Sequence, residues 1–96
     1  MKSTWATVVD NELGTLKLEF NSGMAFLHLI FRKPMDGLRV ARERFPDVKV
    51  ILRMLGYRRV HVAIPEGDYA LYRFETSFGF RECRRAGGNI LMHQEI

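Results

Sequence analysis

Four of the residues that could do chemistry in this sequence lie between positions 19 and 33. Arg32 and Lys33 stand directly before a stretch with helical periodicity, and cations at a helix start suit a phosphate-bearing ligand. His28 interrupts an apolar run, and histidine is the side chain that most often moves protons near neutral pH. Glu19, on the polar side of an alternating segment, could take a proton through a water molecule.

Each of these side chains also has a purely structural interpretation. Arg32 and Lys33 could be solvated residues of an ordinary loop, and Glu19 a solvated strand carboxylate. A lone histidine in a buried strand, such as His28, is more often a hydrogen-bonded core residue than a base. The residue types alone therefore leave both interpretations open.

Length and charge limit what the chain can be. Its 96 residues have room for one domain, and with 47% hydrophobic and 27% charged residues it is too apolar to stay disordered. The net charge is +4, and the first 31 residues carry −1 of it while the remainder carries +5. Any anion site is therefore expected in the later part of the chain.

The sequence also favours a location and argues against a metal ion. Cys83 is the only cysteine, so no internal disulfide can form and a reducing cytoplasm is the simpler compartment. The longest apolar run, Met24–Ile30, is far shorter than the ~18 residues that span a membrane, and no signal-peptide pattern is present. His61, His93 and Cys83 lack the spacing of metal ligands. We expect a cytoplasmic protein with neither membrane contact nor metal.

The first part of the chain predicts three strands. Trp5–Val9 is rich in β-branched and aromatic residues, and Thr15–Phe20 alternates apolar and polar side chains. Met24–Phe31 is almost continuously apolar, which predicts a central strand covered on both faces.

The middle of the chain predicts helix. Apolar residues recur at helical spacing on one face and stop before Gly56: Leu38, Ala41, Phe45, Val48, Leu52 and Leu55. Pro46 interrupts this run, so either one helix kinks there or a second short helix begins with Pro46 in its first turn.

The last part of the chain alternates strand and helix. Arg59–Ile64 predicts a strand, and Asp68 predicts the cap of a second helix that ends at Gly79. The two-glycine turn Gly87-Gly88 then joins two more strands, Phe80–Arg85 and Ile90–Ile96. The order is βββαβαββ, an α+β class in which strands and helices mix within one domain.

Two segments of this order resemble a known family. The helix Asp68–Phe80, with its Arg73-Phe74 pair and its Gly79-Phe80 end, and the hairpin Gly87–Met92 are similar to the second core helix and the closing hairpin of the GCN5-related N-acetyltransferases. The resemblance covers about residues 5–96. It implies a single domain over residues 1–96 with a central mixed sheet and helices on its faces. Relative to the full family fold, we expect the N-terminal helices to be missing.

The resemblance implies that acetyl-CoA binds between the central strand and the strand after the first helix, with its pyrophosphate at the start of that helix. The family's phosphate loop corresponds to Arg32–Gly37, where Arg32 and Gly37 match and Met35 replaces a glycine. The residues expected around the cofactor are Ile30, Phe31, Arg32, Lys33, Met35, Asp36, Gly37, Asp68 and Arg73.

The expected catalytic residues are Glu75, Glu19 and His28. Glu75 occupies the position where the family often has a tyrosine that protonates the leaving thiolate. Its structural alternative is a carboxylate on the helix surface paired with an arginine or a lysine.

Two functions follow from the resemblance. The first is transfer of acetyl from acetyl-CoA to an amine that the sequence does not identify. The second is a structural or interaction protein without catalysis, similar to short proteins of this fold encoded by tailed bacteriophages, which would act in the host cytoplasm with a protein partner. Nucleic acid is a weaker partner because no RNA-binding signature accompanies the arginines. The apolar edge Trp5–Val9 favours a homodimer.

Overall fold

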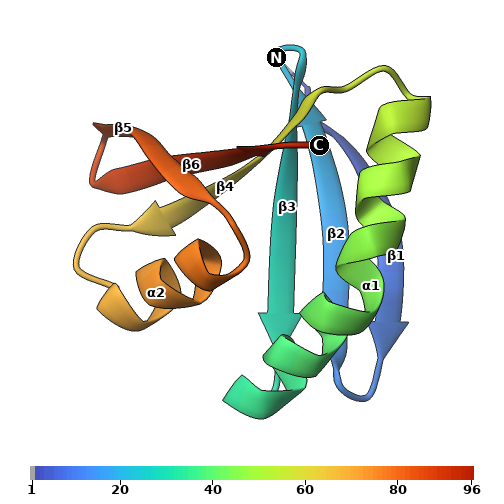
Figure 1. Cartoon of the computed structure of the whole chain (residues 1–96), viewed down its shortest axis with the longest axis horizontal. Coiled ribbons are helices and arrows are strands. Elements are labelled where there is room, and N and C mark those ends of the chain that lie inside the picture. The colour runs from blue at the N-terminus through green and yellow to red at the C-terminus, as the bar shows by residue number, and fades with distance from the viewer. Residues whose placement is uncertain (1) are drawn as a thin grey trace.

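One mixed sheet and two helices make up this computed structural model, which describes residues 2–96 apart from the side chain of Pro34 (Figure 1). The elements follow the predicted order: β1 (Thr4–Asn11), β2 (Gly14–Asn21), β3 (Met24–Phe31), α1 (Pro34–Met54), β4 (Arg59–Pro65), α2 (Tyr69–Ser77), β5 (Arg81–Ala86) and β6 (Asn89–Glu95). The sheet order is β1-β2-β3-β4-β6-β5. The predicted α+β class and order are confirmed.

The strands β1, β2 and β3 form an antiparallel meander. Leu16 and Leu18 of β2 are buried, as the alternation of that segment predicts, because every second side chain points to the same face. The prediction that β3 is covered on both faces is wrong. Only Ala25 of β3 is fully buried, and the side chain of Ile30 remains 64% exposed.

The long helix α1 runs through Pro46 as one helix, so a separate second helix does not begin there. Pro46 is exposed, so the carbonyl group that loses its hydrogen bond to the proline can be solvated. Val48 and Leu52 beyond the proline are fully buried, so the packing of this part of α1 on the sheet holds the helix together.

Local signals set the ends of α2 and of the last hairpin. The carboxylate of Asp68 accepts a hydrogen bond from the Leu71 N–H at 3.1 Å, the expected N-cap. Gly79 follows the helix with a φ of 93°, a conformation that glycine adopts at no steric cost. Gly87 and Gly88 have φ values of 59° and 80°, the positive angles that a two-residue hairpin turn requires.

Both helices pack on the same face of the sheet. The rings of Phe45 in α1 and Phe78, the residue directly after α2, lie 6.3 Å apart, above a buried cluster that includes Val62 of β4. Within residues 2–96 no helix covers the opposite face. On β1 to β3 this open face carries Trp5, Lys17, Glu19, Phe26, His28 and Ile30.

Gly37 lets α1 begin close to the sheet. A Cβ atom built on Gly37 would overlap the ring of Phe31, the last residue of β3. The absence of a side chain at Gly37 therefore serves the contact between α1 and β3.

Substitution of Gly37 tests this contact. Alanine is normally better than glycine inside a helix by about 1 kcal/mol, but overlap with a packed ring costs about 1–3 kcal/mol. We expect Gly37→Ala to lower the free energy of unfolding, measured by urea denaturation. Phe31→Leu in the same background should recover part of the loss, whereas Arg39→Ala on the exposed side of α1 should change little. A Gly37→Ala protein at least as stable as the wild type would contradict the assignment.

Candidate active site

A cavity lies where β3 and β4 separate. The two strands run parallel and register at a single position within the described chain, Phe26 opposite His61. Beyond it the cavity, about 310 Å³ in volume, lies between the strands. Most of its lining is apolar, and its titratable members among the described residues are Lys17, His28 and Glu75.

Glu75 of α2 is the buried acid of this cavity. The residue is 8% exposed, and burial raises the pKa of its carboxyl group to about 7, because the ionised form loses hydration among apolar side chains. The interpretation of Glu75 as a surface carboxylate paired with Arg or Lys is therefore wrong. Its position four residues after Leu71 and three before Phe78, both of which line the cavity, is the sequence signal for this burial.

His28 and Glu19 form a hydrogen-bonded pair on the open face. The Nε2 atom of His28 lies 2.9 Å from Oε1 of Glu19, and the Ser3 hydroxyl donates to Oε2 of the same carboxylate at 2.5 Å. The bond from Ser3, followed by that from His28, lowers the pKa of Glu19. With Nε2–H donating to Glu19, the Nδ1 atom of a neutral His28 is free to accept a proton.

His28 is not fully buried as a core histidine would be, and Glu19 is not fully solvated as a surface carboxylate would be. The side chain of His28 is 39% exposed and that of Glu19 is 19% exposed. The ring of Trp5 packs against His28 with centroids 4.8 Å apart. His28 is therefore held in place from two sides while it reaches the cavity, which Glu19 does not line.

A second, more open hollow lies beside the cavity along α2. Its volume is about 520 Å³, and it lies between the end of β3 and the first turns of α2. Leu29, Ile30, Phe31, Leu71 and Phe74 line both spaces, so the two are adjacent. We call this second hollow the α2 groove; of the expected cofactor residues, Ile30, Phe31 and Asp68 line it.

The other expected cofactor residues lie mostly at the start of α1. Arg32 and Lys33 are exposed and follow the end of β3 directly, and Met35 is 72% exposed in the first turn. The N–H groups of Asp36 and Gly37 both donate to the Lys33 carbonyl. The first turn thus offers an anion the Met35 N–H and the two basic side chains.

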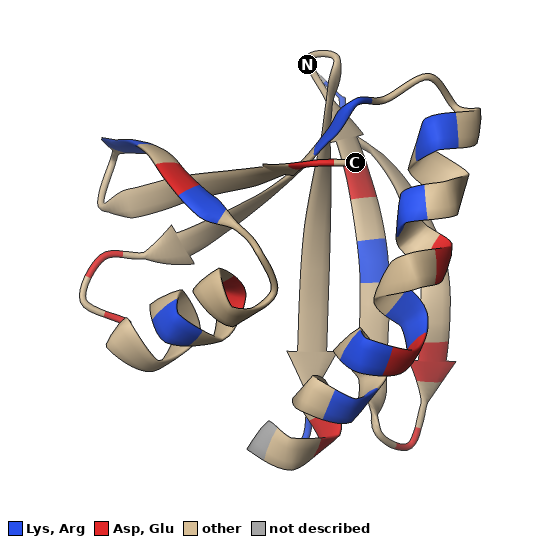
Figure 2. Ribbon diagram, viewed as in Figure 1, with Lys and Arg blue, Asp and Glu red and all other residues tan. Residues whose placement is uncertain are grey.

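The charged residues are distributed unevenly between β3 and α1. Figure 2 shows β3 free of charged residues, whereas blue and red segments alternate along α1. Arg73 of α2 is exposed and lines neither the cavity nor the α2 groove among the described residues. Of the expected cofactor residues within the described chain, only Ile30, Phe31 and Asp68 line a hollow; Arg73 does not, and neither do the expected residues of positions 32–37.

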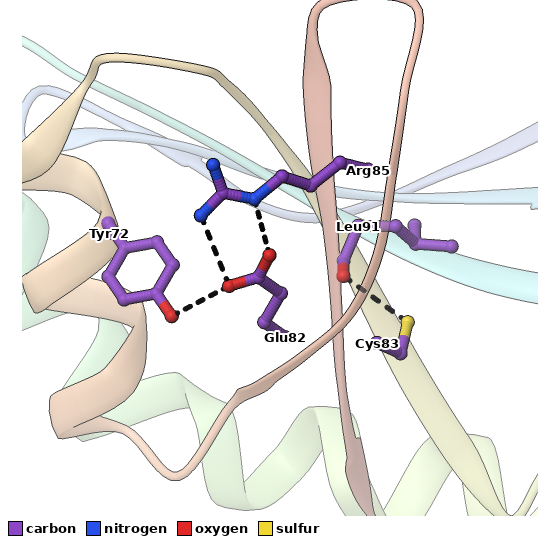
Figure 3. Close-up of polar contacts among 5 residues, drawn as sticks. All are labelled: Tyr72, Glu82, Cys83, Arg85 and Leu91. Carbon is purple, nitrogen blue, oxygen red and sulfur yellow. Dashed lines mark hydrogen bonds and ion pairs between the residues drawn. The ribbon is translucent and has the colours of Figure 1, made fainter.

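Tyr72 is engaged away from the cavity (Figure 3). Its hydroxyl donates to Oε2 of Glu82 at 3.0 Å, and Arg85 donates to both oxygens of the same carboxylate. The hydrogen bond to Glu82 raises the pKa of Tyr72. The network ties α2 to β5 and leaves Glu75 as the one acid of α2 at the cavity among the described residues.

Sequence reasoning missed two residues that line the cavity, Trp5 and Lys17. The signal lies in the pairing of the strands. Lys17 is the register partner of His28, and Trp5 is the partner of Glu19. Once the hairpins are aligned, both side chains fall on the same face as the candidate base.

Residues 2–96 contain no group of three or more His, Cys, Asp or Glu side chains arranged to hold a metal ion. Neither described helix combines the length and the apolar character needed to cross a membrane.

The burial of Glu75 predicts a pH dependence of stability. The pKa of the carboxyl is about 7 in the folded protein against 4.5 in its ordinary state, so between these values the folded protein binds more protons than the unfolded chain. Stability is therefore lost as pH rises from 4.5 to 7, by up to about 3 kcal/mol. Urea denaturation at a series of pH values should show that Glu75→Gln removes this loss.

Glu43→Gln on exposed α1 is the matched control and should keep the wild-type profile. Parallel profiles for wild type and Glu75→Gln would show that Glu75 titrates as an ordinary carboxyl group.

Comparison with solved structures places this arrangement among known folds. No protein-family model and no curated protein sequence matches the chain. An N-acetyltransferase, PaiA, from Thermoplasma acidophilum, solved in complex with coenzyme A, matches with a TM-score of 0.74 and 14% identity over 88% of this chain and 54% of that one. A GNAT-family acetyltransferase from Listeria monocytogenes matches with a TM-score of 0.71 and 11% identity over 88% and 58%.

An acetyltransferase from Streptococcus agalactiae matches with a TM-score of 0.68 and 17% identity over 88% of this chain and 60% of that one. The chain spans little more than half the length of these three proteins. Its six-stranded sheet, opened between β3 and β4 and covered by α1 and α2, has the fold of the GCN5-related N-acetyltransferases.

Proposed function

We propose that this chain is an N-acetyltransferase that moves an acetyl group from acetyl-CoA to an amine. The observation that carries the proposal is the carboxyl group of Glu75, which is buried in the cavity between β3 and β4 with a pKa of about 7. Close to neutral pH such a group is present in both protonation states, as a general acid requires.

The two adjacent hollows suit different parts of acetyl-CoA. The largely apolar cavity suits the thioester end and the pantetheine arm, and the α2 groove extends along α2 beside the end of β3, directly before Arg32 and Lys33. Arg32 and Lys33 stand where the phosphates would lie and supply the charge for them. The N–H of Met35 adds a backbone donor, while Gly37 keeps this turn against Phe31.

Transfer of the acetyl group requires that one proton be removed from the amine and one proton be donated to the leaving thiolate. The amine nitrogen attacks the thioester carbonyl, a C–N bond forms, the C–S bond breaks, and CoA leaves as the thiolate. His28, oriented by Glu19, takes the proton from the amine at Nδ1. Glu75 gives its proton to the thiolate sulfur and is recharged from solvent.

One observation favours the alternative, a structural or interaction protein without catalytic activity. Pro34 has no N–H, and Asp36 brings a negative charge into the first turn of α1, where phosphates would bind. In that case the hollows would hold CoA weakly or not at all, and a protein partner in the cytoplasm, or a second copy at the β1 edge, would be the functional contact.

Titration calorimetry with acetyl-CoA and with CoA tests the binding step. We expect saturable binding that weakens on Lys33→Glu and Arg32→Glu, because each variant turns a phosphate attraction into a repulsion. Arg81→Glu makes the same charge change on β5, outside both hollows, and is the control. Gly37 is unsuitable for this test because its substitution disturbs packing. Absence of binding at millimolar ligand would overturn the proposal.

Steady-state kinetics with Glu75→Gln test the acid. Loss of a general acid lowers kcat by about 100-fold or more, while the Kd for acetyl-CoA should stay within about twofold because glutamine is nearly isosteric. The wild-type kcat should also fall above about pH 7 as Glu75 ionises, and the variant should lack this limb. An unchanged kcat and pH profile would remove Glu75 from the mechanism.

A further inference from the structure

The cavity opens on the open face between residues of three neighbouring strands. Trp5 of β1, Lys17 of β2 and His28 of β3 all line it. Lys17 and His28 are register partners, so their Cβ atoms lie about 5 Å apart on the same face. None of these three residues lines the α2 groove, which lies between the end of β3 and α2 and is therefore available to the other reactant.

Lys17 is the permanent cation of the cavity lining among the described residues. None of the ion pairs or hydrogen bonds within residues 2–96 involves its side chain. Lys17 is half-buried in the cavity lining, which also contains the ring of Trp5. An ammonium group at a cavity without an ion-pair partner favours a ligand that brings an anion.

The neighbouring pair offers the opposite charge. Glu19 accepts hydrogen bonds from Ser3 and His28, which stabilise its carboxylate form. An ammonium group that approaches His28 is therefore attracted to the Glu19 carboxylate behind it. The mouth presents a cation at Lys17 and an anion at Glu19 on the same strand, two residues apart.

The size of the cavity limits the rest of the ligand. A volume of about 310 Å³ equals roughly ten water molecules in the liquid and must also hold the reacting thioester. The ring of Trp5, which is 51% exposed, gives the mouth one flat apolar wall. The site suits a small molecule with two opposite charges close together.

We propose that the acceptor is a small amine that also carries a carboxylate, with the carboxylate bound by Lys17 and the amine directed at His28. The proposal rests on the proposed acetyl transfer for the role of the amine. The recognition of the carboxylate by Lys17 is a separate property of the mouth and can be measured without turnover.

Matched pairs of acceptors isolate the carboxylate in kinetic experiments. Phenylalanine and glycine are compared with phenylalaninamide and glycinamide, which keep the size and remove the negative charge. With wild-type protein and acetyl-CoA we expect kcat/KM to be about 10- to 100-fold higher for the acids, the range of one charge-assisted contact. Lys17→Met should remove this preference through KM, and Lys17→Glu should reverse it toward the amides.

Fluorescence gives a readout that does not depend on acetyl transfer. Trp5 is the only tryptophan of the chain and lines the mouth, so its emission reports on an occupied acceptor site. Phenylalanine should change the emission at concentrations where phenylalaninamide does not. Lys17→Met should abolish the response, whereas the matched variant Lys49→Met, on α1 outside the cavity lining, should retain it.

The two readouts separate the two proposals. A Lys17-dependent fluorescence response without acetylation of any amine would retain carboxylate recognition and overturn the acetyl transfer. Acetylation of acids and amides with equal kcat/KM, unchanged by Lys17→Met, would retain the acetyl transfer and overturn the role of Lys17. An absent or Lys17-independent response to phenylalanine would equally overturn carboxylate recognition.

Discussion

The separation of β3 from β4 is the constraint on which the rest of the structure depends. The two strands register only where Phe26 faces His61, so the sheet consists of two antiparallel blocks that meet at one end. Helices on a single face hold the blocks together, with Phe45 of α1 against Phe78 at the C-terminal end of α2. Because the blocks diverge over this core, an apolar space remains in the middle of the sheet where an ordinary sheet would have hydrogen bonds.

Glu75 shows what such a space does to a charged group. On the exposed side of α2 the same carboxyl would be an ordinary acid, but beside Leu71 and Phe78 it loses hydration and its pKa rises to about 7. The ionised carboxylate therefore costs folding free energy at neutral pH. A buried acid that weakens the fold and faces a cavity is more readily explained by a chemical role than by packing.

The sequence predicts the features that are set locally. Asp68 caps α2 and Gly87-Gly88 turns the last hairpin because these residues act on their own backbone. The one-sided cover of β3 and the burial of Glu75 depend on where two helices pack, which no short pattern encodes. At Pro46 the local propensity of proline favours the end of the helix. Burial of the residues after Pro46 nevertheless keeps α1 continuous.

The sheet also separates the two halves of the proposed reaction. His28 belongs to the open face, whereas Glu75 enters the cavity from α2 on the helix side. A proton can thus be taken at one side of the cavity and given at the other by groups in different surroundings, one partly solvated and one buried. No single residue then has to be both base and acid. Because a sheet is one strand thick, the two reactants can arrive from opposite faces and still meet between β3 and β4.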